Sequence, residues 1–505
     1  MDLANHIIHM ENGKLKGTSR DDVRRIFELF KEDESTDTLL LHMHGGLVAK
    51  TAAEKTAGLL ADKYLEAGAY PVFFVWESFA TETIVNNASE IIQEDLKKIF
   101  DEKFFKRLLL KVAQFMLAKV GVEGGDRGER LELTSEHEIQ RQIDALAVGE
   151  DILSLGLYEQ LSLEELSTQQ EAQFRESLED DMVFTMEAAA IGNSIRPKDE
   201  IEEEVEISRG GFVPGSTQTL MSPDLLEEIR EDSPRKEERG TVSVVKLLNY
   251  SVQILAKVVK RFLEKRDHGL YTTIIEEILR EFYVAAAGKF LWDHMKKDTA
   301  DSFQDNAEVF GGSAFLDELG KMWESGDHPR LVLVGHSAGT VYISHLLKYA
   351  DERLPNEIRF DLVFLASAVT CELFAKTVQD HGHRINEIRQ FGMSDALEKA
   401  DHLVPVIPVY SYSLLYLISG ILEDKSDKPI VGMQRYHEIK EPFLPGSVPD
   451  VDIIRKFFTE SKNRTVWSES DLGPGLNTTG KKHGAFDDED APTLESIQHI
   501  IKEGF

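Results

Sequence analysis

The stretch that most constrains the fold is Leu331–Thr340, with the sequence LVLVGHSAGT. Its four apolar residues, Leu331–Val334, predict a short buried strand, and the residues that follow Gly339 have helical spacing. A serine on so tight a strand-to-helix turn has a strained backbone, which holds its hydroxyl exposed above the sheet. Gly335 and Gly339 flank Ser337 because a Cβ at either position would meet a neighbouring strand or helix. The stretch therefore predicts a parallel α/β sheet with an exposed serine at its edge.

The rest of the chain supports a mostly parallel sheet flanked by helices. Residues 6–16 predict a hairpin across an Asn-Gly turn, and a helix is expected between the strands at 37–44 and 70–76. A strand, a helix and a strand at this spacing indicate a parallel pair with a crossover. Further strands and helices alternate after Ser337, and they are expected at 359–366, 370–379, 385–393, 428–436, 464–468 and 492–502.

The pentapeptide Gly-His-Ser-Ala-Gly resembles the nucleophile elbow, G-x-S-x-G, of the α/β-hydrolase superfamily. A second motif, His44-Gly45-Gly46-Leu47, ends the strand at 37–44 and is similar to the H-G-G-x turn of the same superfamily. The resemblance implies that Ser337 is a nucleophile. It also implies that the backbone N–H groups of Ala338 and Gly46, with Leu47 as the next choice, hold an oxyanion. The alternative is a plain Gly-rich turn, and His44 itself is expected to be structural.

On this fold the acid that orients the catalytic histidine follows the strand two beyond the nucleophile strand. Asp395 comes directly after the strand at 385–393 and is the predicted acid, with Asp401 in reserve. Asp361 lies near the start of the strand expected at 359–366 and so at the wrong end of the sheet. Asp395 could instead be only a helix N-cap.

The superfamily places its general-base histidine just ahead of the last helix. His483 lies on a Gly-rich loop before the helix at 492–502, and His437 is the runner-up. The chain order Ser337, Asp395, His483 then matches the superfamily order of serine, acid and histidine. A solvated loop histidine is the alternative for His483.

The α/β-hydrolase pattern is interrupted between the two motifs. Residues 1–83 and 307–505 form the predicted core, and 84–306 form a helical insertion whose part 124–240 is expected to be mobile or disordered with short helices. The chain carries 57 basic and 90 acidic residues, a formal net charge of −33, and residues 131–240 alone hold 28 acidic against 9 basic residues. Because hydrolase lids commonly follow the strand after the nucleophile, a lid role for this insertion is an open question.

Two other segments have more than one interpretation. The uncharged run at 404–422 is long enough to raise the question of a membrane span, but its prolines, serines and tyrosines favour a core element or an apolar wall over the site. The acidic cluster at 487–490 invites a metal-site interpretation, yet it has no His or Cys at ligand spacing, which favours a solvated face. No metal and no organic cofactor is expected.

Composition limits the compartment and the partners. Cys371 is the single cysteine, so no intrachain disulfide can form, and a reducing, cytoplasmic location is expected. The N-terminus has no basic region followed by a long apolar one, which argues against secretion. The acidic balance disfavours nucleic acid and anionic membrane surfaces as partners.

Together these features predict a serine esterase, lipase-like, that cleaves a carboxylic or lipid ester through an acyl-enzyme on the triad Ser337, Asp395 and His483. The apolar flanks Leu47, Trp76 and the run at 404–422 favour an ester. An amidase or peptidase of the same fold is one alternative. A binding or signalling protein that recruits a protein partner through the acidic insertion is the other, because one fold hosts many functions.

Overall fold

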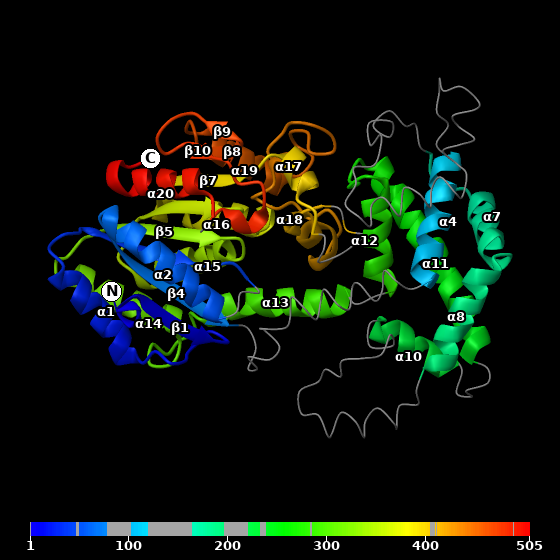
Figure 1. Ribbon diagram of the computed structural model, residues 1–505, viewed down its shortest axis with the longest axis horizontal. Coiled ribbons are helices and arrows are strands. Elements are labelled where there is room, and N and C mark those ends of the chain that lie inside the picture. Colours follow the sequence, from blue (N-terminus) through cyan, green and yellow to red (C-terminus); the bar gives the residue numbers. More distant parts are fainter. Residues whose placement is uncertain are drawn as a thin grey trace.

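The computed structural model describes residues 2–46, 50–77, 103–119, 164–195, 221–232, 239–282, 285–403, 410, 412–487 and 489–505. Within these residues the predicted strands pair in one eight-stranded sheet, ordered β2-β1-β4-β3-β5-β6-β7-β8 (Figure 1). The strands are β1 (Ile7–Glu11), β2 (Lys14–Leu15), β3 (Thr38–Met43), β4 (Ala69–Glu77), β5 (Arg330–His336), β6 (Phe360–Leu365), β7 (Ile385–Met393) and β8 (Thr465–Ser468). A second, two-stranded sheet pairs β9 (Ser470–Asp471) with β10 (Asn477–Thr478).

The large sheet is parallel except for its β1–β2 hairpin. That hairpin turns at Asn12 and Gly13, whose φ angles of 50° and 75° fit a tight turn, as predicted from the Asn-Gly pair. β3 pairs in parallel with both β4 and β5, and the last pair in that register joins Met43 to Gly335. The carboxyl ends of β3 and β5 therefore lie side by side, which brings the two motifs together.

Alternate residues of the central strands enter two different cores, as a sheet covered on both faces requires. In β5, Leu331 and Leu333 belong to one core, and Val332 and Val334 belong to the other. The first face is covered by α1 (Arg20–Glu32), α14 (Gly311–Glu324), α15 (Gly339–Arg353), α16 (Cys371–His381) and α19 (Pro449–Thr459). The second face is covered by α2 (Lys50–Glu66) and α20 (Ala491–Glu503).

A group of helices lies between β4 and β5 in the chain and stands beside the sheet (Figure 1). Its members are α4 (Lys103–Lys119), α7 (Thr168–Glu179), α8 (Met182–Ser194), α10 (Pro223–Asp232), α11 (Arg239–Leu263) and α12 (Leu270–Phe282). Three of them, α7, α8 and α10, fall within 124–240, where short helices were expected. The rest of that range, and with it the prediction of mobility, lies outside the described residues. Its described residues beyond these three helices are 164–167, 180–181, 195, 221–222 and the start of α11.

Helix α11 is the centre of this group. It packs closely on α8, because a Cβ at Gly192 would lie 2.4 Å from the Arg239 carbonyl oxygen and 2.5 Å from the Ser243 Cβ. By length and composition alone, α11 is the one helix in the described part of the chain that could cross a membrane. Its contacts with α7, α8, α10 and α12 are those of a helix inside a bundle.

Helix α13 (Ala285–Asp301) returns from the helical group to the sheet (Figure 1). It packs against α15 and against the π-helical turn η5 (Ile418–Leu422), which follows α18 (Leu414–Leu417). The described end of the 404–422 run is thus helical and buried, and residues 404–409 and 411 lie outside the described residues. Residues 270–301 hold two helices, α12 and α13.

Buried charges join the helical group to the C-terminal half of the chain. Arg261 Nη1 lies 2.7 Å from Glu276 Oε2, and His268 Nδ1 lies 2.8 Å from the other oxygen of Glu276. His268 Nε2 in turn lies 3.0 Å from Asp427 Oδ1, and all four side chains are at most 5% exposed. Breaking one such buried pair leaves an uncompensated charge, at a typical cost of about 3–5 kcal/mol.

The strand predicted at 428–436 is not formed. This segment makes an isolated bridge from Ile430 to Thr370 and a short 3-10 turn, η6 (Gln434–Tyr436). Its apolar residues Ile430, Val431 and Met433 are buried on the first face of the sheet, so burial rather than strand pairing explains the pattern.

Candidate active site

Ser337 lies between the end of β5 and the start of α15, with φ = 51°. A non-glycine residue in this left-handed region is strained, so the surrounding structure must hold it there. Its N–H donates to the Leu365 carbonyl oxygen at 2.9 Å, and its own carbonyl oxygen accepts from the Ala368 and Thr340 N–H groups at 3.1 Å. Backbone bonds on both sides thus fix the serine at the edge of the sheet.

The two flanking glycines are required by close contacts, as the sequence predicted. A Cβ at Gly339 would lie 2.2 Å from the Met43 carbonyl oxygen of β3, and a Cβ at Gly335 would lie 2.7 Å from Ile343 Cδ1 of α15. Neither position has room for a side chain. The turn can therefore be this tight only with glycine on both sides of Ser337.

His483 is brought to Ser337 by the loop between β10 and α20. Its Nε2 lies 2.9 Å from Ser337 Oγ, and the ring belongs to the 3-10 turn η7 (His483–Ala485). Burial, followed by the nearby charge of His336, lowers the pKa of His483 to about 3, so the ring is neutral at neutral pH. A neutral imidazole at this distance can accept the proton of the serine hydroxyl.

The structure does not bring Asp395 to His483. Asp395 opens α17 (Asp395–Ala400), where its Oδ1 accepts from the Tyr416 hydroxyl at 2.6 Å and its Oδ2 pairs with Lys399 at 2.9 Å. Burial would raise the pKa of Asp395, but Lys399 and Tyr416 lower it overall. The Asp395 carboxylate is thus bonded to Tyr416 and Lys399, and it lies at the opposite end of α17 from the end that faces His483.

Asp401, the reserve acid, is the carboxylate that contacts His483. It follows α17, and its Oδ2 accepts from the His483 backbone N–H at 2.9 Å. Burial raises the pKa of Asp401, while this hydrogen bond lowers it. Among the described residues, His483 Nδ1 has no hydrogen-bond partner. Asp401 therefore holds the main chain of His483. The ring nitrogen Nδ1 of His483 still has a proton to donate.

The H-G-G turn lies against the elbow. A Cβ at Gly45 would be 3.4 Å from Ser337 Cβ, and a Cβ at Gly46 would be 3.2 Å from Ala338 Cβ. Ala338 is the N-cap of α15, where backbone N–H groups have no partner within the helix. The two predicted oxyanion donors are therefore neighbours, while Leu47 lies outside the described residues.

His44 shapes this turn, in keeping with the structural role predicted for it. Its Nδ1–H donates to the Gly45 carbonyl oxygen at 2.6 Å, and its Nε2 accepts from the Trp76 N–H at 3.1 Å. The ring stacks on the Trp76 ring, with centroids 5.5 Å apart. Both ring nitrogens are thus used within the turn and its neighbouring strand.

The acidic cluster at 487–490 is a solvated face only in part, since Glu489 is exposed and residue 488 lies outside the described residues. Asp487 is 8% exposed and its Oδ2 lies 3.0 Å from His336 Nδ1, while Asp490 is 7% exposed and caps the N-terminus of α20. The sequence analysis assigned no role to His336 or Asp487. The short spacing from His483 to Asp487 is the one signal that could have indicated this pair.

The site is covered. Ser337 is 4% exposed, Ala338 2% and His483 7%. Met295 of α13 reaches Gly46, since a Cβ at Gly46 would lie 2.9 Å from both Met295 Sδ and Cε. Helix α13 is itself fixed at Glu423, which accepts from Trp292 Nε1 at 2.6 Å and Lys296 Nζ at 3.0 Å.

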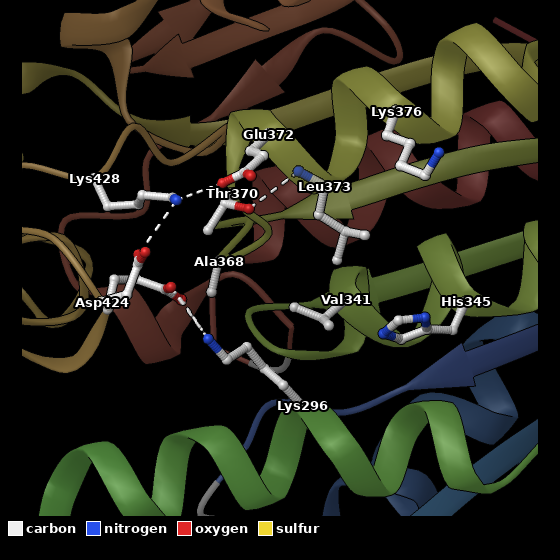
Figure 2. A pocket seen from close by; sticks show the side chains of 11 residues that line it. Lys296, Val341, His345, Ala368, Thr370, Glu372, Leu373, Lys376, Asp424 and Lys428 are labelled. Carbon is white, nitrogen blue, oxygen red and sulfur yellow. Dashed lines mark hydrogen bonds and ion pairs between the residues drawn. The ribbon is translucent and has the colours of Figure 1, made fainter. Parts of the chain in front are cut away.

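A pocket of about 430 Å³ lies beside the elbow helix (Figure 2). Its lining combines apolar side chains with paired charges, from α13, α15, α16 and the segments around 368 and 423: Lys296, Val341, His345, Ala368, Thr370, Glu372, Leu373, Lys376, Glu423, Asp424 and Lys428. Lys428 pairs with Glu372 and with Asp424 at 3.2 Å. Ala368 connects the pocket to the site, because its N–H donates to the Ser337 carbonyl oxygen.

His437, the alternative general base, lies away from Ser337. Its Nε2 lies 2.7 Å from the Val431 carbonyl oxygen, and its ring packs on Phe458 and Trp467. In the described part of the chain, no three His, Cys, Asp or Glu side chains are grouped so that they could hold a metal ion.

Comparisons of this chain with protein-family models, with curated proteins and with solved structures find no significant match. The function is therefore argued from the residues and their geometry.

Proposed function

We propose that this protein is a serine hydrolase in which Ser337 is the nucleophile and His483 the general base. The observation that carries the proposal is the 2.9 Å contact between Ser337 Oγ and His483 Nε2, at a serine with φ = 51° between a strand and a helix. Nucleophile and base within hydrogen-bond reach are the signature of an activated serine.

The sheet supports the resemblance to α/β-hydrolases. Ser337 follows β5, the two candidate acids follow β7, and His483 follows β8 and the small β9–β10 sheet. Ser337, the acids and His483 therefore lie at the carboxyl edge of a parallel sheet, where ligands of open α/β sheets bind.

In the proposed reaction, Ser337 Oγ attacks the acyl carbonyl carbon and its proton passes to His483 Nε2. The carbonyl π electrons move to the oxygen, which the N–H groups of Ala338 and Gly46 stabilise. When the tetrahedral intermediate collapses, the bond to the leaving group breaks and the proton on His483 goes to that group. Water, deprotonated by His483, then attacks the acyl carbon. The bond from that carbon to Ser337 Oγ breaks, the acid leaves, and His483 returns the proton to Ser337 Oγ.

We assign the orienting carboxylate to Asp401 ahead of Asp395. Asp401 already accepts from the His483 main chain at 2.9 Å, whereas Asp395 is paired with Lys399 and Tyr416. An ester is the favoured substrate because Val341, Ala368 and Leu373 give the adjoining pocket an apolar part. An amidase or peptidase would use the same chemistry.

One observation favours a regulated protein as the second candidate. Ser337 and His483 are nearly inaccessible, with Met295 packed on the oxyanion turn. A partner that draws α13 away from Gly46 would switch such a site on. This candidate retains the same serine chemistry and adds the requirement for a partner.

The test is labelling with a small fluorophosphonate, in which the Ser337 Oγ–P bond forms and fluoride leaves. Wild type should be labelled on Ser337 alone, and Ser337→Ala should not be labelled. Ser344→Ala is the matched control, because Ser344 is a buried serine of α15 whose hydroxyl bonds to the Thr340 carbonyl oxygen. Equal labelling of wild type and Ser337→Ala would refute the assignment. No labelling of folded wild type would favour the partner-regulated candidate.

A further inference from the structure

His336, the residue before the proposed nucleophile, is held between two oxygen atoms. Its Nδ1 lies 3.0 Å from Asp487 Oδ2, and its Nε2 lies 3.1 Å from the His483 carbonyl oxygen. The three residues are each less than 9% exposed. The proposed reaction makes no use of His336 or Asp487.

Both neighbours of the His336 ring can only accept hydrogen bonds. A carbonyl oxygen has no proton, and a carboxylate has none when ionised. Burial raises the pKa of Asp487, but His336 and then His42 lower it to about 2, so Asp487 is ionised at neutral pH. The Nε2–H of His336 donates to the carbonyl oxygen, and the ionised carboxylate 3.0 Å from Nδ1 favours a proton on that nitrogen as well. The ring is then an imidazolium.

We propose that His336 and Asp487 form a buried ion pair that positions His483 on Ser337 and keeps a positive charge beside both. This inference rests on the proposed function, and His336 is a positioning residue because it acts through His483. The His336 Nε2–H fixes the His483 backbone from one side, while Asp401 accepts from the His483 N–H on the other. The general base is thus held at both its backbone N–H and its backbone carbonyl oxygen.

The positive charge also affects how readily His483 takes a proton. The two rings have centroids 5.3 Å apart, and like charges at that distance oppose each other. With an effective dielectric constant of about 20, the interaction amounts to roughly two pH units. The opposite charge of Asp487 offsets a part of it. His336 should therefore lower the pKa of His483. His483 then stays neutral, and able to act as a base, down to a lower pH.

Among the described residues, three elements place further titratable groups around the pair. β3 and the turn after it contribute His42 and His44, and burial lowers the pKa of these residues to about 3 and about 4. α2 contributes Tyr64, whose hydroxyl lies 3.1 Å from His42 Nδ1, and burial raises its pKa. Asp401 faces His483 from the end of α17. At neutral pH, His42, His44 and Tyr64 are therefore uncharged. Of the groups named here, His336 is the one that carries a positive charge near His483.

The first experiment reads the ion pair directly, through the ring ¹⁵N signals of histidine-labelled full-length protein. Wild type should show an imidazolium that persists at pH 8, and that signal should be absent in His336→Gln and lost or shifted in Asp487→Asn. A neutral His336 ring at pH 7 would overturn the inference. This readout does not depend on any activity, so it separates failure of the ion pair from failure of the proposed function.

The second experiment measures the rate of fluorophosphonate labelling between pH 4 and 8. Wild type should label at a nearly constant rate over this range, because the pKa of His483 is about 3. Glutamine can still donate to the His483 carbonyl oxygen but carries no charge, so the acid limb of the His336→Gln profile should move up by about two pH units, into the measured range. Asp487→Asn removes the carboxylate that keeps His336 charged, so its acid limb should also move up, by a smaller amount. Asp490→Asn is the control for a merely structural effect, because Asp490 caps α20 and accepts hydrogen bonds from Thr479. An unchanged acid limb in both folded variants would overturn the role.

Discussion

Truncation of Met295 tests whether α13 closes the proposed active site. The side chain is 3% exposed, and its Sδ and Cε rest against Gly46 at the oxyanion turn. Alanine in its place removes three buried heavy atoms, which at about 0.8 kcal/mol for each methylene-sized group is about 2 kcal/mol. Truncation of buried methionine generally costs about 2–5 kcal/mol, so this is a conservative figure.

Suppose that α13 must leave Gly46 before a reagent reaches Ser337. The truncation then destabilises only the closed form, in which α13 packs on Gly46, by about 2 kcal/mol of lost packing. The open population, and with it the rate of fluorophosphonate labelling, should then rise about 30-fold in Met295→Ala, since 1.4 kcal/mol corresponds to a factor of ten. Met295→Leu, which keeps the volume, should label at nearly the wild-type rate.

The matched control is Met322→Ala. Met322 is a methionine of α14 with 2% exposure that packs on the same face of the sheet. Both alanine variants should lower Tm, but Met295→Ala alone should label faster. Equal labelling rates for wild type, Met295→Ala and Met322→Ala would refute the idea that α13 closes the site.

Three further predictions follow from the contacts. Asp401→Asn should slow labelling about 100-fold or more, whereas Asp395→Asn should act mainly on Tm; the reverse order would restore the assignment made from the sequence. Burial raises the pKa of Glu398 to about 8 from an ordinary value of 4.5, so wild type should lose several kcal/mol of stability as the pH rises from about 4.5 to 8. Glu398→Gln should remove this loss and melt higher than wild type at pH 8, with little difference at pH 4.5. Gly339→Ala should lower Tm and abolish labelling, because the new Cβ would lie 2.2 Å from a carbonyl oxygen, whereas Gly58→Ala, with open space around the Cβ, should be neutral or stabilising.

The sequence predicted the sheet well because its strands are buried on both faces. Such strands are continuous apolar runs, and β3, β4, β5, β6 and β7 all lie where those runs occur. The Ser337 turn was predictable for a local reason, since two glycines and a strand-to-helix change specify it. The contact with His483 followed from the order of residues along the chain.

Two features of the site depended on geometry that chain order does not specify. Asp395 and Asp401 follow the same strand, and the short helix α17 decides that only Asp401 reaches His483. The pairing of His336 with Asp487 is a contact between the elbow and the loop before α20. A carboxylate in an acidic run normally indicates a solvated surface, and only tertiary packing buries this one.

The ion pairs between His268, Glu276 and Asp427 have a consequence for how the chain is made. His268 and Asp427 are separated by 159 positions, so the ribosome produces the helical group long before the partner that its buried charges need. At about 5–20 residues per second, this delay is on the order of ten seconds. During that time Glu276 and His268 can pair with each other but have no contact with Asp427. Docking of the helical group is therefore a late event in biogenesis, completed only after β7 has emerged.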